Sequence, residues 1–161
     1  MREVAFQTAL FAAVAVGAIA FELRREMVSL WRLAPAPLAA VACALSLPSE
    51  PRWLGAAIGA VVVGLVAGSV RGLSAALRVD HIWKVVRLRR AEFDGVLVAL
   101  LIAVLAGADI SPVVDFMTRR LTPPPFGAIA FLCAGYLVGR AASIGVRSWS
   151  ASHDDMPPDH P

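Results

Sequence analysis

An uncharged stretch followed at once by a basic one constrains this chain more than any other feature. Residues 53–70 hold 18 consecutive uncharged side chains, which as a helix rising about 1.5 Å per residue would cross the core of a bilayer. Residues 71–90 then carry six cations against one acid, Asp80. Because short Arg- and Lys-rich loops remain in the cytoplasm, this order predicts a transmembrane helix whose carboxyl end is cytoplasmic.

The composition agrees with a membrane protein. Hydrophobic residues make up 58% of the chain and charged residues 17%, and the charges lie in clusters between apolar runs. Basic residues beside apolar runs are explained by lipid headgroups, whereas nucleic-acid binding requires a basic face on a soluble module. We therefore expect the lipid bilayer, with its anionic headgroups, as a partner and no nucleic acid. Fourteen Arg against one Lys is a usage typical of a GC-rich bacterium, which suggests the bacterial inner membrane.

The apolar runs predict an all-α, polytopic transmembrane helix bundle of about five spans. The segment over residues 27–47 is the weakest of the expected spans. Its uncharged run begins only at Leu33, and Pro35 and Pro37 interrupt the first turns of the helix. A re-entrant segment is the alternative. The transmembrane domain is expected to cover residues 1–147, followed by a disordered tail over 148–161 that is rich in proline and acids. The five expected spans are about 4–21, 27–47, 53–70, 93–110 and 126–146.

The distribution of cations favours five spans over four. Five spans place 11 Lys and Arg residues on one side and 4 on the other, while four spans place 9 and 6. The positive-inside rule therefore predicts an external N-terminus and a cytoplasmic C-terminus. The sequence Ala18-Ile19-Ala20 resembles the cleavage site of a secretory signal, but cleavage would move the central cations to the outside, so we expect an uncleaved first span.

Small residues recur every four positions in the third and fifth spans. At this spacing they line one face of a helix, and small side chains on such a face let a second helix backbone approach closely. The pattern predicts helix packing, between these two spans or against a partner, which is another membrane protein or a second copy. The expected packing residues are Ala56, Ala60, Gly64, Gly68, Gly72, Gly135 and Gly139.

The central basic loop has two interpretations. Val79, Ile82, Trp83 and Val86 fall at helical spacing, which favours an amphipathic helix lying in the cytoplasmic interface. The alternation over residues 85–90 is instead typical of a short strand. In either form the cations are expected to contact lipid headgroups. They are Arg71, Arg78, Lys84, Arg87, Arg89 and Arg90.

Few residues suggest chemistry. No Asp, Glu or His lies in the middle of an expected span, and the sequence holds no phosphate loop or zinc motif, so we expect no enzyme activity, no catalytic or metal site and no cofactor. Arg140, inside the last span, is expected to extend to the inner headgroups, or else to pair with Asp94 or Glu22. Cys43 and Cys133 both fall in the outer half of the membrane and form a candidate redox pair.

A glycine-laddered span, then VRG, LRVD and an Arg-rich stretch resembles the uncharacterised bacterial CcdC-like integral membrane proteins. The residues that carry the resemblance are Gly64, Gly68, Arg71, Gly72, Arg78 and Asp80, with Gly139-Arg140 as a second occurrence. This resemblance implies a thiol-redox or haem-assembly role in cytochrome c maturation. The residues themselves favour a non-enzymatic accessory or assembly component of a membrane complex, and the other alternative is a small transporter or channel subunit acting as a homo-oligomer.

Overall fold

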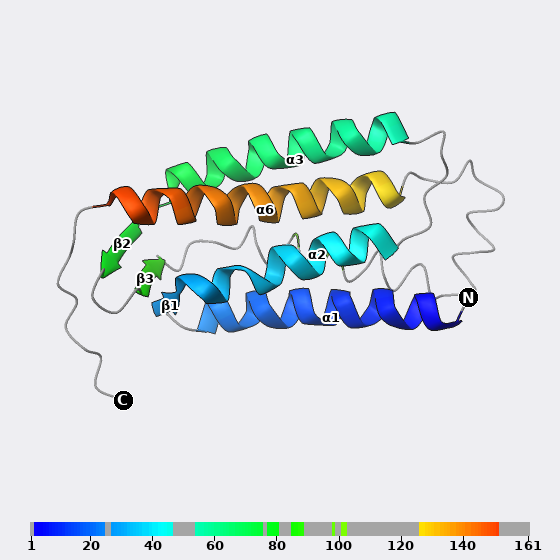
Figure 1. Ribbon diagram of the computed structural model, residues 1–161, viewed down its shortest axis with the longest axis horizontal. Coiled ribbons are helices and arrows are strands. Elements are labelled where there is room, and N and C mark those ends of the chain that lie inside the picture. Colours follow the sequence, from blue (N-terminus) through cyan, green and yellow to red (C-terminus); the bar gives the residue numbers. More distant parts are fainter. Residues whose placement is uncertain are drawn as a thin grey trace.

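The fold is mostly helical, with two layers of helices and a small sheet at one end (Figure 1). One layer holds α1 (Arg2–Arg24) and α2 (Pro35–Ser46), the other α3 (Leu54–Ser74) and α6 (Phe126–Ser150). Helix α2 runs opposite to α1, α3 and α6, which share one direction (Figure 1). The structure, a computed structural model, describes residues 2–24, 27–46, 54–75, 77–80, 85–88, 98, 101–102 and 126–151.

Two of the described helices, Leu54–Ser74 and Gly127–Ser150, are long and apolar enough to cross a membrane. Two further apolar segments, Ala9–Phe21 and Pro35–Ser46, are shorter. The described residues therefore do not support five spans. The expected span over 93–110 lies almost wholly outside them, and of its described residues Ile102 is buried in the core. Residues 148–150 of the expected tail continue α6, and residues 152–161 lie outside the described residues.

Residues 27–47 do not form one spanning helix. They divide into strand β1 (Met27–Ser29), a 3-10 turn η1 (Leu30–Leu33) and α2, whose 12 residues are about 18 Å long. Pro35 occupies the first helical position, where its fixed backbone angle favours the helix and no N–H is required. The prolines therefore begin the helix here instead of interrupting one that starts at Met27.

The central loop is a hairpin and not the expected amphipathic helix. Strands β2 (Leu77–Asp80) and β3 (Val85–Leu88) are antiparallel, and β1 pairs with the other edge of β3 to give the order β1-β3-β2. The strand alternative was therefore correct for Val85–Leu88. Val79 and Val86 are seven residues apart, which fits a helical period, but here they are direct partners on two strands, and pairing of β3 with the distant β1 favours the strand form.

The sheet has two chemically different faces. Val79 is buried while its neighbour Arg78 is exposed, as strand alternation requires. On the inner side Leu77 packs against Leu33 and Ile144. The sheet lies where α1, α3 and α6 end, and we call this the sheet end of the bundle (Figure 1).

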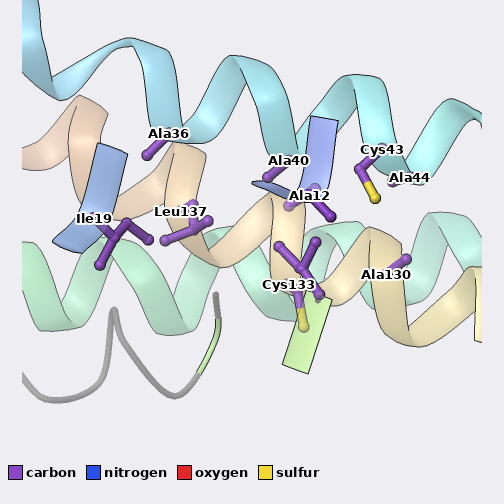
Figure 2. Packing of buried hydrophobic residues seen from close by; sticks show 11 residues of the cluster. Ala12, Ile19, Ala36, Ala40, Cys43, Ala44, Ala130, Cys133 and Leu137 are labelled. Carbon is purple, nitrogen blue, oxygen red and sulfur yellow. The ribbon is translucent and has the colours of Figure 1, made fainter. Parts of the chain in front are cut away.

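A core of small side chains joins the two layers. Alanines dominate it, and Cys43 from α2 and Cys133 from α6 lie among them (Figure 2). Small side chains allow helices to pack closely, with little volume between them. The buried members are Ala12, Ile19, Ala36, Ala40, Cys43, Ala44, Ile102, Ala130, Cys133, Ala134 and Leu137.

Candidate functional site

Helices α3 and α6 pack extensively against each other along the glycines of α3. A Cβ added to Gly64 would overlap the carbonyl oxygen of Leu132, and one added to Gly68 would overlap that of Tyr136. One turn further on, a Cβ on Gly72 would overlap Ser143 Oγ and lie 2.8 Å from the carbonyl oxygen of Arg140. Only glycine leaves space for the α6 backbone at these positions.

Helix α6 contributes its own small residues to the same contact. A Cβ on Gly135 would lie 2.6 Å from the carbonyl oxygen of Val61, and one on Gly139 would overlap that of Leu65. The two helices therefore alternate glycines along the contact, so that each backbone fits beside the other. We call this contact the α3–α6 seam. It brings together five of the seven expected packing residues, Gly64, Gly68, Gly72, Gly135 and Gly139.

The other two expected packing residues lie outside the seam. Ala56 is exposed and Ala60 is half-buried, whereas Ala57 is buried. The reason is geometric: each four-residue step advances about 40° beyond a full helical turn, so a row of this spacing winds slowly around the helix. Four such steps separate Gly72 from Ala56, which places Ala56 about 160° from Gly72 and on the opposite side of α3.

Arg147 closes the carboxyl end of α3 from the neighbouring helix. Its Nη1 donates to the carbonyl oxygens of Gly72 at 3.0 Å and of Ala75 at 2.7 Å. The last carbonyls of a helix have no partner within the helix and carry partial negative charge, so a guanidinium is well suited to them. Ser74 Oγ donates to the carbonyl oxygen of Arg71, a further one of this turn.

The sequence contained a signal for Arg147 that the cation count overlooked. It follows Gly135, Gly139 and Ser143 at the same four-residue spacing, so it is the next position on that row of α6. A cation placed there reaches the end of whichever helix the row contacts. Its packing role can therefore be read from the row.

Arg140 is enclosed by the bundle. Its side chain is 7% exposed, so it does not extend outward to the headgroups as expected. It follows Leu137 by one turn on the face of α6 that carries the core residues. Within the described ranges every buried side-chain nitrogen and oxygen has a hydrogen-bond partner, which is the condition under which a buried charge is tolerated.

The two cysteines share one cluster and are not joined by a disulfide. Both are buried, Cys43 on α2 and Cys133 on α6. Figure 2 shows the Cys133 sulfur directed away from α2. Buried thiols usually behave as small apolar side chains, because attack and oxidation require access to the sulfur. A redox role for this pair stays a prediction.

Three of the six expected headgroup cations lie in described elements, at or near the sheet end. Arg71 is in the last turn of α3, Arg78 is on β2, and Arg87 is on β3 directly opposite Arg78 in the strand register. Arg78 is exposed and Arg71 half-buried. Lys84, Arg89 and Arg90 lie outside the described residues.

No family model, curated protein or solved structure matches the chain.

Proposed function

We propose that this chain is a polytopic membrane protein that acts as a non-enzymatic accessory or assembly component of a membrane complex. The observation that carries the proposal is the outer side of α3, opposite the seam. Val62, Val66 and Val70 lie on this side and are each more than half exposed. Together with Val63 and Leu73 they form what we call the outer apolar face of α3, and Leu54 and Ile58, nearer the start of the helix, are exposed to a similar extent.

Such a face is unfavourable in water over this length. An aliphatic surface on each turn of a 21-residue helix exceeds the scattered apolar side chains that a soluble monomer exposes. Lipid tails or a partner helix would cover this face and avoid the unfavourable contact of its apolar side chains with water. The glycines of α3 support the same conclusion, because packing through backbone contact is how helices associate where no hydrophobic driving force acts between them.

The charges support a cytoplasmic sheet end and an external N-terminus. In the described ranges, the far end of the bundle holds one cation and one acid, Arg2 and Glu3. Toward the sheet end the acids are Glu22 and Asp80. That end has a large excess of cations, which under the positive-inside rule belongs in the cytoplasm. Its arginines are Arg24, Arg32, Arg71, Arg78, Arg87, Arg140 and Arg147.

The shared direction of α1, α3 and α6 supports five crossings. Helix α3 ends at the sheet end and α6 begins at the far end, so residues 75–125 connect opposite ends of the bundle (Figure 1). One further crossing between them, over about 93–110, together with a membrane-embedded α2, gives the proposed five segments. The bacterial inner membrane is the proposed location.

Purification of the tagged full-length protein in mild detergent, with mass spectrometry of what co-purifies, tests the accessory role. The expected result is a stoichiometric membrane-protein partner, lost when Val62→Asn and Val66→Asn make the outer apolar face of α3 polar. Ala44→Ser, inside the core, is the matched control and should retain the partner. A homogeneous particle containing only this chain would contradict the accessory role.

Arg140 favours a second candidate, a small transporter or channel subunit that acts as a homo-oligomer. A charge enclosed within a candidate span is uncommon, and such residues often mark the path of an ion or substrate. A purified homo-oligomer whose flux of small anions in liposomes is lost in Arg140→Gln, with the oligomer intact, would establish this function. Equal flux in both proteins would exclude it.

A further inference from the structure

Two tryptophans at the sheet end of the bundle are the most exposed large apolar side chains among the described residues. Trp31 of η1 is 83% exposed, and Trp149, in the last turn of α6, is 87% exposed. Both elements lie at the sheet end (Figure 1). An indole has a large apolar ring and a single N–H donor, so water suits only a small part of its surface. Two such side chains directed outward at one end indicate surroundings other than water alone.

A packing contact places both tryptophans at a similar height along the bundle. Leu33, two residues after Trp31 in the same 3-10 turn, packs against Ile144 of α6. Trp31 precedes this contact by about 4 Å of 3-10 helix, on the side of β1. Trp149 follows Ile144 by five residues, about 7.5 Å of α-helix, in the direction of the sheet end. Both residues therefore lie within about two turns of one contact, on its sheet side.

The uncharged part of α3 ends at this height. It begins at Leu54 and ends at Arg71 in the last turn, after 17 residues that span about 25 Å, close to the thickness of a bilayer core. Arg147 bonds to the carbonyl oxygen of Gly72, the next residue of α3, and precedes Trp149 by only two positions. Because the core of a bilayer excludes cations, the headgroups are expected to begin at the level of Trp149.

The two indoles belong to different layers of the bundle. The turn η1, which carries Trp31, contacts α1 and α2, whereas Trp149 is on α6. There it follows Val146, which is 67% exposed, by about one turn on the outer side of the helix. A single protein partner would have to extend over both layers to cover the two rings. A headgroup layer surrounds the bundle and contacts both, which favours lipid over protein as the occupant.

We propose that Trp31 and Trp149 are interfacial anchors, which contact the boundary between lipid headgroups and acyl chains and hold the sheet end of the bundle at that depth. This boundary suits an indole, since it offers apolar chains to the ring and water and ester carbonyls to the N–H. Lipid charge is not part of the contact. Because Leu77 of β2 packs at the same contact as Leu33, the sheet then lies in the headgroup layer. The inference rests on the membrane location proposed above and not on the accessory role.

Single-tryptophan proteins in phosphatidylcholine vesicles measure the depth of each indole. Variants of the full chain retain Trp31 or Trp149, with the other three tryptophans changed to Phe, and bromine atoms at defined positions on the acyl chains quench the fluorescence. Bromines nearest the headgroup should quench both indoles at least about twofold more than bromines near the chain end. The control is Val62→Trp with all four native tryptophans changed to Phe. Since Val62 is near the middle of α3, bromines near the bilayer centre should quench this indole most.

A second measurement tests whether the two indoles hold the bundle at its depth. With Cys43 and Cys133 changed to Ala, a spin label on Val70→Cys reports its depth through collisions with oxygen and with a water-soluble nickel complex. Changing both Trp31 and Trp149 to Leu should move the label toward the bilayer centre by about 2–5 Å, up to one helical turn, because leucine prefers the core. Changing both to Tyr retains amphipathic rings and should leave the depth unchanged.

Several results would overturn the proposal. They are quenching of either native indole that is strongest at the bilayer centre, a label depth that does not change in the Leu variant, and an equal shift in the Tyr variant. Quenching that requires anionic lipid would overturn it as well. So would protein that floats with vesicles while both indoles resist every bromine, since the rings would then contact water or protein. Failure to float with vesicles would instead contradict the membrane location itself.

Discussion

Arg147 donates a 2.7 Å hydrogen bond to the carbonyl oxygen of Ala75, a residue 72 positions earlier in the chain. Ala75 is the bend that follows α3, so this bond fixes the position where α3 leads toward β2 and the sheet. The end of α6 thereby holds the α3 end and the sheet together. The same guanidinium nitrogen also bonds Gly72 in the last turn of α3.

Removal of this guanidinium should loosen the α3–β2 connection first. We expect Arg147→Ala to lower the free energy of unfolding by about 1.5–3 kcal/mol, because hydrogen bonds from a charged group are lost and two carbonyls lose their donor. Arg147→Lys retains the charge but lacks the second donor direction of the guanidinium, so its free energy of unfolding should lie between those of the unaltered protein and Arg147→Ala. Hydrogen exchange should increase at the end of α3 and in β2. Unchanged protection there would contradict the role of Arg147.

Two glycines on α3 should respond oppositely to alanine. Gly68→Ala places a Cβ against the carbonyl oxygen of Tyr136 and should cost about 1–3 kcal/mol, because the helices must separate to accommodate it. Gly59→Ala meets no atom within 4 Å and should be neutral or stabilising by up to about 1 kcal/mol. Unfolding in mixed detergent, followed by circular dichroism, measures both. Equal effects would mean that the seam does not depend on close approach.

The strand register predicts a specific crosslink. With Cys43 and Cys133 changed to Ala, Arg78→Cys and Arg87→Cys should form a disulfide under mild oxidation, because directly opposed strand residues lie within disulfide reach. In a continuous helix nine residues would separate them by about 13 Å, and no bond would form. The control pair, Arg78→Cys with Leu88→Cys, occupies opposite faces and should not crosslink. Efficient crosslinking of the control pair would contradict the register.

The native thiols should resist modification. Because Cys43 and Cys133 are buried thiols, a water-soluble maleimide should label the folded protein at least about tenfold more slowly than the denatured protein. The Cys43→Ala, Cys133→Ala protein should label in neither state and serves as the blank. Rapid labelling of the folded chain would show that the thiols are accessible, and would favour the redox interpretation.

Whether the sequence predicts a feature of this fold depends on how local the sequence signal for that feature is. Small residues in α3 and α6 repeat within one helix, so the packing face between Gly64 and Gly72 can be read without knowing the fold. The hairpin cannot be read in this way. Residues 79–86 place apolar side chains at helical spacing while residues 85–90 alternate as in a strand, and the decision depends on β1, a strand 56 to 60 residues earlier that is too short to be visible in the sequence.

Helix α2 shows a different limit. Pro35 and Pro37 were interpreted as interruptions of a longer helix, although a proline at the first position is equally a start signal. Arg147 shows a third limit, because its hydrogen-bond partners lie at the end of another helix. Only its place on the row of Gly135 and Gly139 suggests the contact. Exposure of Trp31 and Trp149 at one end is visible only once the elements are placed.

The alternating glycines of the α3–α6 seam have a consequence for permeation. Where the backbone of one helix lies directly against the backbone of the next, no lining of side chains exists to select or conduct a solute. Opening a passage there would require breaking each of these backbone contacts at once. The seam therefore acts as a closed wall, and a conducting path through this protein has to follow another pair of surfaces, such as those around the enclosed Arg140.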